Sequence, residues 1–362
     1  MRKSFLSPLV VGGIVLAGVV TSGEEAPVSR FEGEIEVSEV LLDVLVTDKD
    51  GNLVTGLTKD DFVVEEDGEQ LTLSGVSFYS TRYSIDGRSG ALDGEIPASR
   101  YFIFFFHDQR FFASGDSRLL RRQLRAARDS REWIETEMKP SDWVAVVGYD
   151  VKLKVHQDFT QDREAITRAL SDAARGEDPG NNWPSRRQAI PSTRASLFRS
   201  LPVGKKLRKE TRVIYDAIRL LAEATGHIVG RKNLLLFSTG FGVVDGSGIF
   251  ARPDRRYYPD LEQALNDNHV AIYTMDLVPV GSRHSQEGFL NTLAADSGGL
   301  YYHNIINFLT PLRKIANENI GYYLLSYRAE HPVGEVGYQK VSIRMRERRL
   351  KVRAPRGYRY GD

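Results

Sequence analysis

The stretch Tyr101–Asp108, YFIFFFHD, is an apolar run that ends in a histidine and a carboxylate. A short, fully apolar run bounded by polar residues is typical of a strand buried on both faces, as in the centre of a parallel sheet. Ligands of open α/β sheets bind at the carboxyl ends of the strands. The sequence therefore predicts a central strand with Asp108 at the functional edge of the sheet. Position alone leaves open that Asp108 merely begins a loop.

Apolar strands and amphipathic helices alternate after this stretch. The further strands expected in this region are Lys152–Phe159 and three core strands: Trp143–Tyr149, Asn233–Phe237 and Val270–Met275. Apolar residues three, four or seven apart mark the intervening helices. This alternation predicts an α/β domain over residues 100–320, built on a doubly wound, mostly parallel sheet.

Both ends of the chain have a β pattern instead. Residues 34–80 alternate apolar and polar side chains, with a hairpin turn at Asp48–Asn52. So short a segment holds too few strands to close a sandwich alone. We expect the strands of 321–362 to pack with 34–80 as a β-sandwich, with the α/β domain inserted after a linker at Ser84–Ser99.

The N-terminus has the features of an export signal. Residues 1–23 combine Arg2 and Lys3 with an apolar run and then small residues, which predicts a cleaved signal peptide followed by a tether at 24–33. The alternative is that residues 5–20 are kept as a membrane anchor. The chain has no cysteine, which suits a bacterial envelope protein. We therefore expect export to the periplasm or the exterior, with no membrane span after cleavage. The net charge of +1 gives no argument for nucleic acid.

Five motifs, in order along the chain, resemble a known family. The order of elements from Tyr101 to Ile320 resembles a von Willebrand factor type A (VWA) domain, and the flanks resemble the VWA-related family abundant in Acidobacteria. The motifs are VLLDVLVTDKDGNLVTGLTKDDFVVEEDGE at Val40–Glu69, GRKNLLLFSTGFG at Gly230–Gly242, VAIYTMD at Val270–Asp276, GYYLLSY at Gly321–Tyr327 and LKVRAPRGY at Leu350–Tyr358.

The resemblance implies a metal-ion-dependent adhesion site that is degenerate here. Such sites use an Asp-x-Ser-x-Ser loop, a threonine and a later aspartate, because Mg²⁺ prefers hard oxygen ligands. Asp108 matches the first aspartate, but Arg110 and Phe112 replace both serines. Thr211 matches the threonine, whereas Ser238-Thr239-Gly240 stands where Asp-Gly is expected.

Asp108 and Thr211 are thus the remaining metal ligands, and Mg²⁺ is the only cofactor suggested. Arg110 would compete for the carboxylate and repel the cation. The alternative is a metal-free fold in which Asp108 pairs with Arg110 or caps the helix beginning at Ser117. In either case Asp108, Thr211, Ser238 and Thr239 are expected on the ligand-binding face.

Residues 172–210 form a long, cation-rich insertion without periodicity, which predicts a functional or solvated loop. Because it precedes the Thr211 helix, it would emerge on the same face. Its cations would recognise an acidic protein or cell-surface polymer. The four that we expect to matter most are Arg186, Arg187, Lys205 and Lys206. The alternative is a loop that only carries solvated charge.

One enzymatic interpretation competes with these. An aspartate ending an apolar strand, with a later strand ending Ser238-Thr239, is also typical of haloacid dehalogenase-type phosphatases, where Asp108 would be the nucleophile. That class needs an acid two positions on, where this chain has Arg110. No G-x-S-x-G elbow, P-loop or metal-binding histidine spacing occurs. The sequence favours an exported, non-enzymatic interaction protein.

Overall fold

The structure is a computed structural model that describes residues 35–81, 95–97, 99–108, 117–179, 194–332 and 335–361. At its centre is a six-stranded sheet in the order β13-β12-β9-β6-β7-β8. Only the β7–β8 pair is antiparallel. The strands are β6 (Arg100–His107), β7 (Asp142–Tyr149), β8 (Leu153–Thr160), β9 (Lys232–Ser238), β12 (Val270–Asp276) and β13 (Tyr301–Tyr302). The prediction of a mostly parallel sheet centred on Tyr101–Asp108 is confirmed.

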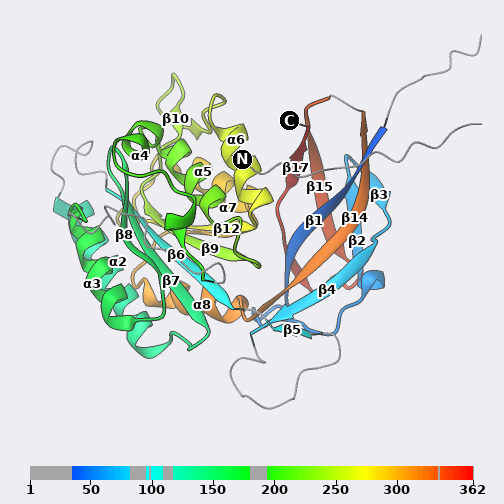
Figure 1. Cartoon of the computed structure of the whole chain (residues 1–362), viewed down its shortest axis with the longest axis horizontal. Coiled ribbons are helices and arrows are strands. Elements are labelled where there is room, and N and C mark those ends of the chain that lie inside the picture. The colour runs from blue at the N-terminus through cyan, green and yellow to red at the C-terminus, as the bar shows by residue number, and fades with distance from the viewer. Residues whose placement is uncertain are drawn as a thin grey trace, which may run out of the picture. The chain divides into compact units, whose positions relative to one another are not determined.

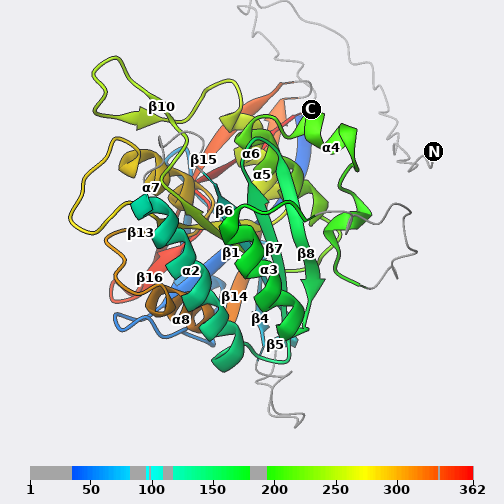
Figure 2. The ribbon, with the colours of Figure 1, turned by 90° about the vertical axis from the view of Figure 1, so that its left-hand side faces the viewer.

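Helices cover both faces of this sheet because the central strands are apolar on both sides. Ile103 and Phe105 of β6 belong to one core cluster, and Phe102, Phe104 and Phe106 belong to the other. The first cluster packs under α5 (Ile214–Ala224), α6 (Tyr258–Asp267) and α7 (Glu287–Asp296). The second packs under α2 (Ser117–Thr136), α3 (Arg163–Arg175) and α8 (Leu309–Glu318), which face the viewer in Figure 2.

Two antiparallel sheets combine strands from both ends of the chain. One has the order β16-β1-β14-β4-β5 and the other β17-β15-β2-β3. A single hydrophobic cluster joins side chains of both sheets, among them Val44, Val64 and Tyr327. Figure 1 shows these strands in blue and red. They are β1 (Ile35–Thr47), β2 (Phe62–Glu66), β3 (Glu69–Leu71), β4 (Gly75–Ser80), β5 (Glu95–Pro97), β14 (Gly321–Pro332), β15 (Gly337–Met345), β16 (Lys351–Arg353) and β17 (Gly357–Tyr360).

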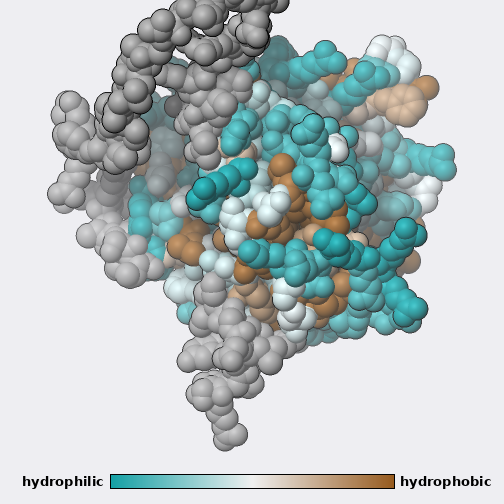
Figure 3. Space-filling view, turned by 90° about the vertical axis from the view of Figure 1, so that its right-hand side faces the viewer, coloured by the Kyte–Doolittle hydropathy of each residue, from teal (hydrophilic) through white to brown (hydrophobic). Residues whose placement is uncertain are grey.

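The described surface on one side of the molecule is predominantly hydrophilic. Figure 3 shows this side, with hydrophobic residues gathered near its middle. No helix among the described residues is long and apolar enough to cross a membrane. The signal peptide at 1–23 and the tether at 24–33 lie outside the described residues.

Three expectations about local structure need correction. The apolar pattern of Leu71–Phe78 predicts one strand, but β3 ends at Leu71 and β4 begins only at Gly75. The expected linker Ser84–Ser99 includes the short strand β5. The insertion at 172–210 is not aperiodic throughout. Its first residues complete α3, and its later part holds a 3-10 turn, η3 (Leu197–Arg199), and α4 (Lys205–Glu210). Leu197 and Leu207 are buried, so apolar anchors tie this part to the core. The remaining short elements are η1 (Lys59–Asp61), β10 (Val243–Val244) and β11 (Ala251–Arg252).

Candidate functional site

The sheet reverses its winding between β6 and β9. The chain leaves β6 into α2 on one face, whereas after β9 it reaches α6 on the other. Such a switch point opens a crevice at the carboxyl ends of the two strands. Phe106 and Phe237 are in register, so His107 and Ser238 meet at this edge. The candidate site is therefore at the expected end of the Tyr101–Asp108 strand.

His107 and Ser238 form a buried polar pair. The His107 Nδ1 and Ser238 Oγ atoms are 2.8 Å apart, and Ser238 Oγ also accepts a hydrogen bond from Gly240 N at 2.9 Å. His107 is 5% exposed and Ser238 is 0% exposed. Burial lowers the pKa of His107 to about 3 despite the neighbouring charge of Asp108. The imidazole is therefore neutral at pH 7, and the Ser238 hydroxyl is held by protein groups.

Asp108 and Thr211 are both buried beside the β7–β8 hairpin. Asp108 N donates to Tyr149 O at 2.7 Å, and Tyr149 OH donates to Arg212 O at 2.8 Å. The Thr211 hydroxyl accepts from Leu153 N at 3.0 Å and donates to Leu207 O at 2.8 Å. Thr211 is 0% exposed. The Thr211 side chain therefore caps the C-terminal end of α4 and holds the first residue of β8, and it is closed to solvent.

These contacts do not fit a magnesium site. Mg²⁺ needs six oxygens in near-octahedral geometry and keeps several waters. The Thr211 hydroxyl is already bonded twice, and the Ser238 hydroxyl is bonded to Gly240 and next to His107. No cluster of three or more His, Cys, Asp or Glu side chains suited to a metal occurs in the described parts of the chain. The Gln109–Asp116 loop lies outside those parts.

Asp276, at the end of the next strand along the sheet, is also held by protein groups. Its Oδ2 is 2.8 Å from His284 Nε2 and accepts from Tyr301 OH at 2.8 Å. Its Oδ1 accepts from Val278 N at 2.8 Å. Burial, and then the negative charge of Asp276, raise the pKa of Tyr301. Asp276 thus anchors the loop after β12.

Arg122 also holds the loop that follows β12. It lies on α2 and donates to the carbonyl oxygens of Asp276, Leu277 and Ile305. Arg122 is only 9% exposed, whereas the apolar Leu124 on the same helix is 39% exposed. Helical periodicity alone predicts that an arginine lies on the polar, exposed face of α2. It could not predict the burial of Arg122, because it contains no information about carbonyl groups that are distant in the sequence.

An apolar hairpin that the sequence reasoning missed rises from the same edge. It comprises β10, β11 and the turn between them, and lies at the top of Figures 1 and 2. Four large apolar side chains on it are exposed by 43% to 62%: Val243, Val244, Ile249 and Phe250. Gln286 fixes its base by donating to Gly242 O and accepting from Gly242 N. The turn residues Asp245-Gly246-Ser247-Gly248 between apolar pairs were the available signal.

The predicted basic residues are only partly described. Lys205 and Lys206 are exposed on α4, at the carboxyl edge of the sheet, and Lys206 Nζ lies 3.7 Å from Glu210 Oε1. Thr239 is half-buried beside the hairpin. Arg186 and Arg187 lie outside the described residues. The structure therefore places two of the four cations.

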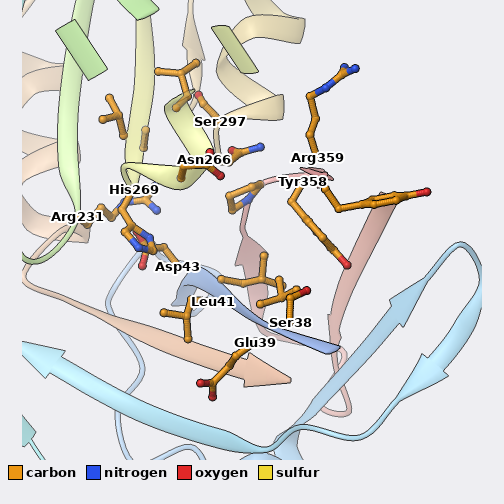
Figure 4. Close-up of a pocket in the computed structure, with 18 of the residues that line it drawn as sticks. Ser38, Glu39, Leu41, Asp43, Arg231, Asn266, His269, Ser297, Tyr358 and Arg359 are labelled. Atoms are coloured by element: carbon orange, nitrogen blue, oxygen red, sulfur yellow. The ribbon is translucent and has the colours of Figure 1, made fainter. Parts of the chain in front are cut away.

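A pocket of about 430 Å³ lies at the opposite edge of the sheet and was not predicted. It is lined by β1, by the α6–β12 connection and by β17 (Figure 4). His269 Nδ1 and Asp43 Oδ2 are 3.2 Å apart, and Arg231 Nη2 donates to Gly298 O at 2.7 Å. Burial alone would raise the pKa of Asp43, but His269, Arg231 and Lys232 together lower it. Asp43 is thus a buried anion among cations.

No family model matches this chain, and no curated protein matches it. Similar solved structures include an aerotolerance-related membrane protein from Bacteroides fragilis, with 11% identity, coverage of 61% of this chain and 98% of the other, and a TM-score of 0.36. BatB from Bacteroides thetaiotaomicron has 15% identity, coverage of 61% of this chain and 97% of the other, and a TM-score of 0.37. Proximal thread matrix protein 1 from the mussel byssus, with a zinc-occupied MIDAS motif, has 12% identity, coverage of 62% of this chain and 48% of the other, and a TM-score of 0.38.

Proposed function

We propose that this chain is an exported, non-enzymatic interaction protein that recognises a protein or a cell-surface polymer. Its recognition face is the carboxyl edge of a VWA-like sheet, carried on a β-sandwich formed by residues 34–80 and 321–362. The adhesion site on this face is degenerate, and recognition does not need a metal. The main support is that protein groups already bind the Ser238 and Thr211 hydroxyls.

The exposed surface around the buried site supports a binding role. Four apolar side chains project from the hairpin after β9, and clustered exposed apolar residues mark interaction sites. Lys205 and Lys206 add positive charge at the same edge. A partner with an apolar patch beside acidic groups would complement both features. Substrate chemistry has less support, because Asp108 is only 3% exposed and a nucleophile must reach its substrate.

Because the proposed site is independent of metal, calorimetry should detect no binding of Mg²⁺ or Mn²⁺. Titration of Mg²⁺ or Mn²⁺ into residues 24–362 should give no saturable heat, because the Thr211 and Ser238 hydroxyls are already engaged by protein groups. The Asp108→Ala variant should behave identically. Saturable binding by the native chain that Asp108→Ala abolishes would contradict a metal-free site.

A phosphatase assay on the native chain and the Asp108→Asn variant separates the phosphatase alternative from the binding role. A haloacid dehalogenase-type enzyme would hydrolyse p-nitrophenyl phosphate with added Mg²⁺, and Asp108→Asn would abolish the turnover. We expect no turnover above that of a buffer blank in either protein. Turnover lost in Asp108→Asn would replace the interaction role with catalysis.

The basic insertion predicts binding to polyanions. Substituting Arg186, Arg187, Lys205 and Lys206 by glutamine removes four positive charges, so the variant should elute from immobilised polyglutamate at clearly lower salt than the native chain. A matched control substitutes four cations from other parts of the chain by glutamine; Arg313, Lys314, Arg328 and Lys340 are all exposed. Equal shifts in the two variants would show that only net charge matters and that the insertion has no specific role.

A further inference from the structure

We propose that the open edge of β1, over Ser38–Asp43, binds an extended peptide segment of a partner protein by strand addition. This site lies at the opposite edge of the parallel sheet from the recognition face and shares no residue with it. The inference therefore stands or fails independently of the proposed function.

The edge is open because β16 pairs only with the C-terminal end of β1. β1 pairs with β14 over Ile35–Val44 on one side, but on the other side β16 pairs only with Leu45–Thr47. Proline lacks the backbone N–H that a ladder requires. Pro355 follows β16, and the chain then crosses to the other sheet as β17. Among the described residues, no strand pairs with Ser38–Asp43 on that side.

The register identifies which backbone groups the open edge presents. Backbone groups in an antiparallel strand point alternately to the two neighbouring strands. Ser326 O of β14 accepts from Ser74 N on the β4 side, so the preceding residue, Leu325, points to β1, where its partner is Leu42. Even-numbered residues of β1 therefore bond to β14. The N–H and C=O groups of Glu39, Leu41 and Asp43 face the opposite side.

These groups face the pocket described above. Figure 4 shows β1 along its floor, with Asn266 and His269 across from it and Arg231 and Tyr358 toward opposite ends. From Glu39 to Asp43 a strand spans about 13 Å, which matches a segment of about five residues. Because Asn266 and His269 lie across the pocket from β1, a strand added to β1 would meet a wall on its outer side, which favours a single extended segment over the edge of a folded sheet.

Two side chains define the chemistry of the segment. Leu41 is 44% exposed, and side chains directly opposite one another lie on the same face, so an apolar residue is expected opposite it. Arg231 is 4% exposed, and its Nε has no hydrogen-bond partner. A buried donor left unpaired is costly. Because the Arg231 guanidinium lines the pocket, a glutamine or glutamate near the Asp43 end of the segment would complement its charge.

The test compares Leu41→Pro with Leu41→Ala in the full chain. Proline at this position removes only an N–H that faces away from β14, so the sheet should remain folded, and alanine retains that N–H. The probes are synthetic octapeptides in which leucine or valine alternates with threonine and one end carries glutamine, glutamate or lysine. Binding is followed by fluorescence anisotropy, and folding by circular dichroism.

We expect peptides ending in glutamine or glutamate to bind with a Kd below about 1 mM. Leu41→Pro should weaken binding roughly ten-fold, and Leu41→Ala by less, because only proline removes a backbone hydrogen bond. Methylating alternate peptide amides should abolish binding in one register and leave it unchanged in the other.

Three outcomes would overturn the inference. The first is that no peptide binds, or that both methylated registers bind equally well. The second is that the chain dimerises and Leu41→Pro abolishes the dimer, since the occupant would then be a second copy. The third is that the Leu41 amide is protected from hydrogen exchange without peptide and exposed by deleting residues 24–34, since the chain itself would then cover the edge.

Discussion

Replacing Asp142 by alanine should destabilise the protein by about 3–5 kcal/mol, because it leaves a buried guanidinium without its counter-ion. Asp142 is 0% exposed and Arg100 is 5% exposed. Arg100 Nε and Nη2 both donate to the carboxylate at 2.6 Å. Lys139 N donates to the same carboxylate at 2.7 Å. The substitution therefore breaks two buried hydrogen bonds and one partly buried hydrogen bond at once.

Urea unfolding followed by circular dichroism measures this loss as a lower midpoint. The Arg100→Met/Asp142→Leu double variant should lose less than Asp142→Ala, since replacing both charges leaves no unpaired ion. Arg256, whose side chain is 75% exposed in its ion pair with Asp254, gives a second control, and Arg256→Ala should leave the midpoint almost unchanged. A loss below about 1 kcal/mol in Asp142→Ala would mean that water or another acceptor replaces the carboxylate.

Stability should fall steeply in weak acid because His107 cannot take up a proton in the folded state. Burial lowers its pKa from the ordinary value of 6.5 to about 3. Between these values the unfolded chain binds a proton that the folded chain does not, so the free energy of unfolding falls as the pH falls. The slope is about 1.4 kcal/mol per pH unit for one such group. From pH 6.5 to pH 4 the loss is thus about 3 kcal/mol.

The His107→Asn variant isolates this contribution. Asparagine retains a polar group beside Ser238 but does not titrate. Between pH 4 and pH 6.5, the slope of unfolding free energy against pH should therefore decrease by about 1.4 kcal/mol per pH unit. Burial also lowers the pKa of His156 to about 4, and His156→Asn should flatten the same interval independently. Parallel stability profiles for the native chain and His107→Asn would show that His107 becomes protonated without unfolding.

The sequence by itself determined the core strands of the parallel sheet and the class of the fold. Tyr101–His107 has no polar face, so it can form only a strand covered on both sides, and the alternation that follows admits few arrangements other than a doubly wound sheet. The strand signals at both ends were also local. They come from a period of two, which depends only on neighbouring residues.

Only the tertiary structure decided how the polar groups are used. His107 and Ser238 meet across 131 positions of sequence. Thr211 bonds Leu153 and Leu207 instead of facing a metal, and Arg122 finds three carbonyls that no helical periodicity could indicate. The open edge of β1 likewise depends on where Pro355 directs a distant strand. A motif specifies which donors and acceptors are available, but a buried polar group bonds whichever partner the packing brings within reach.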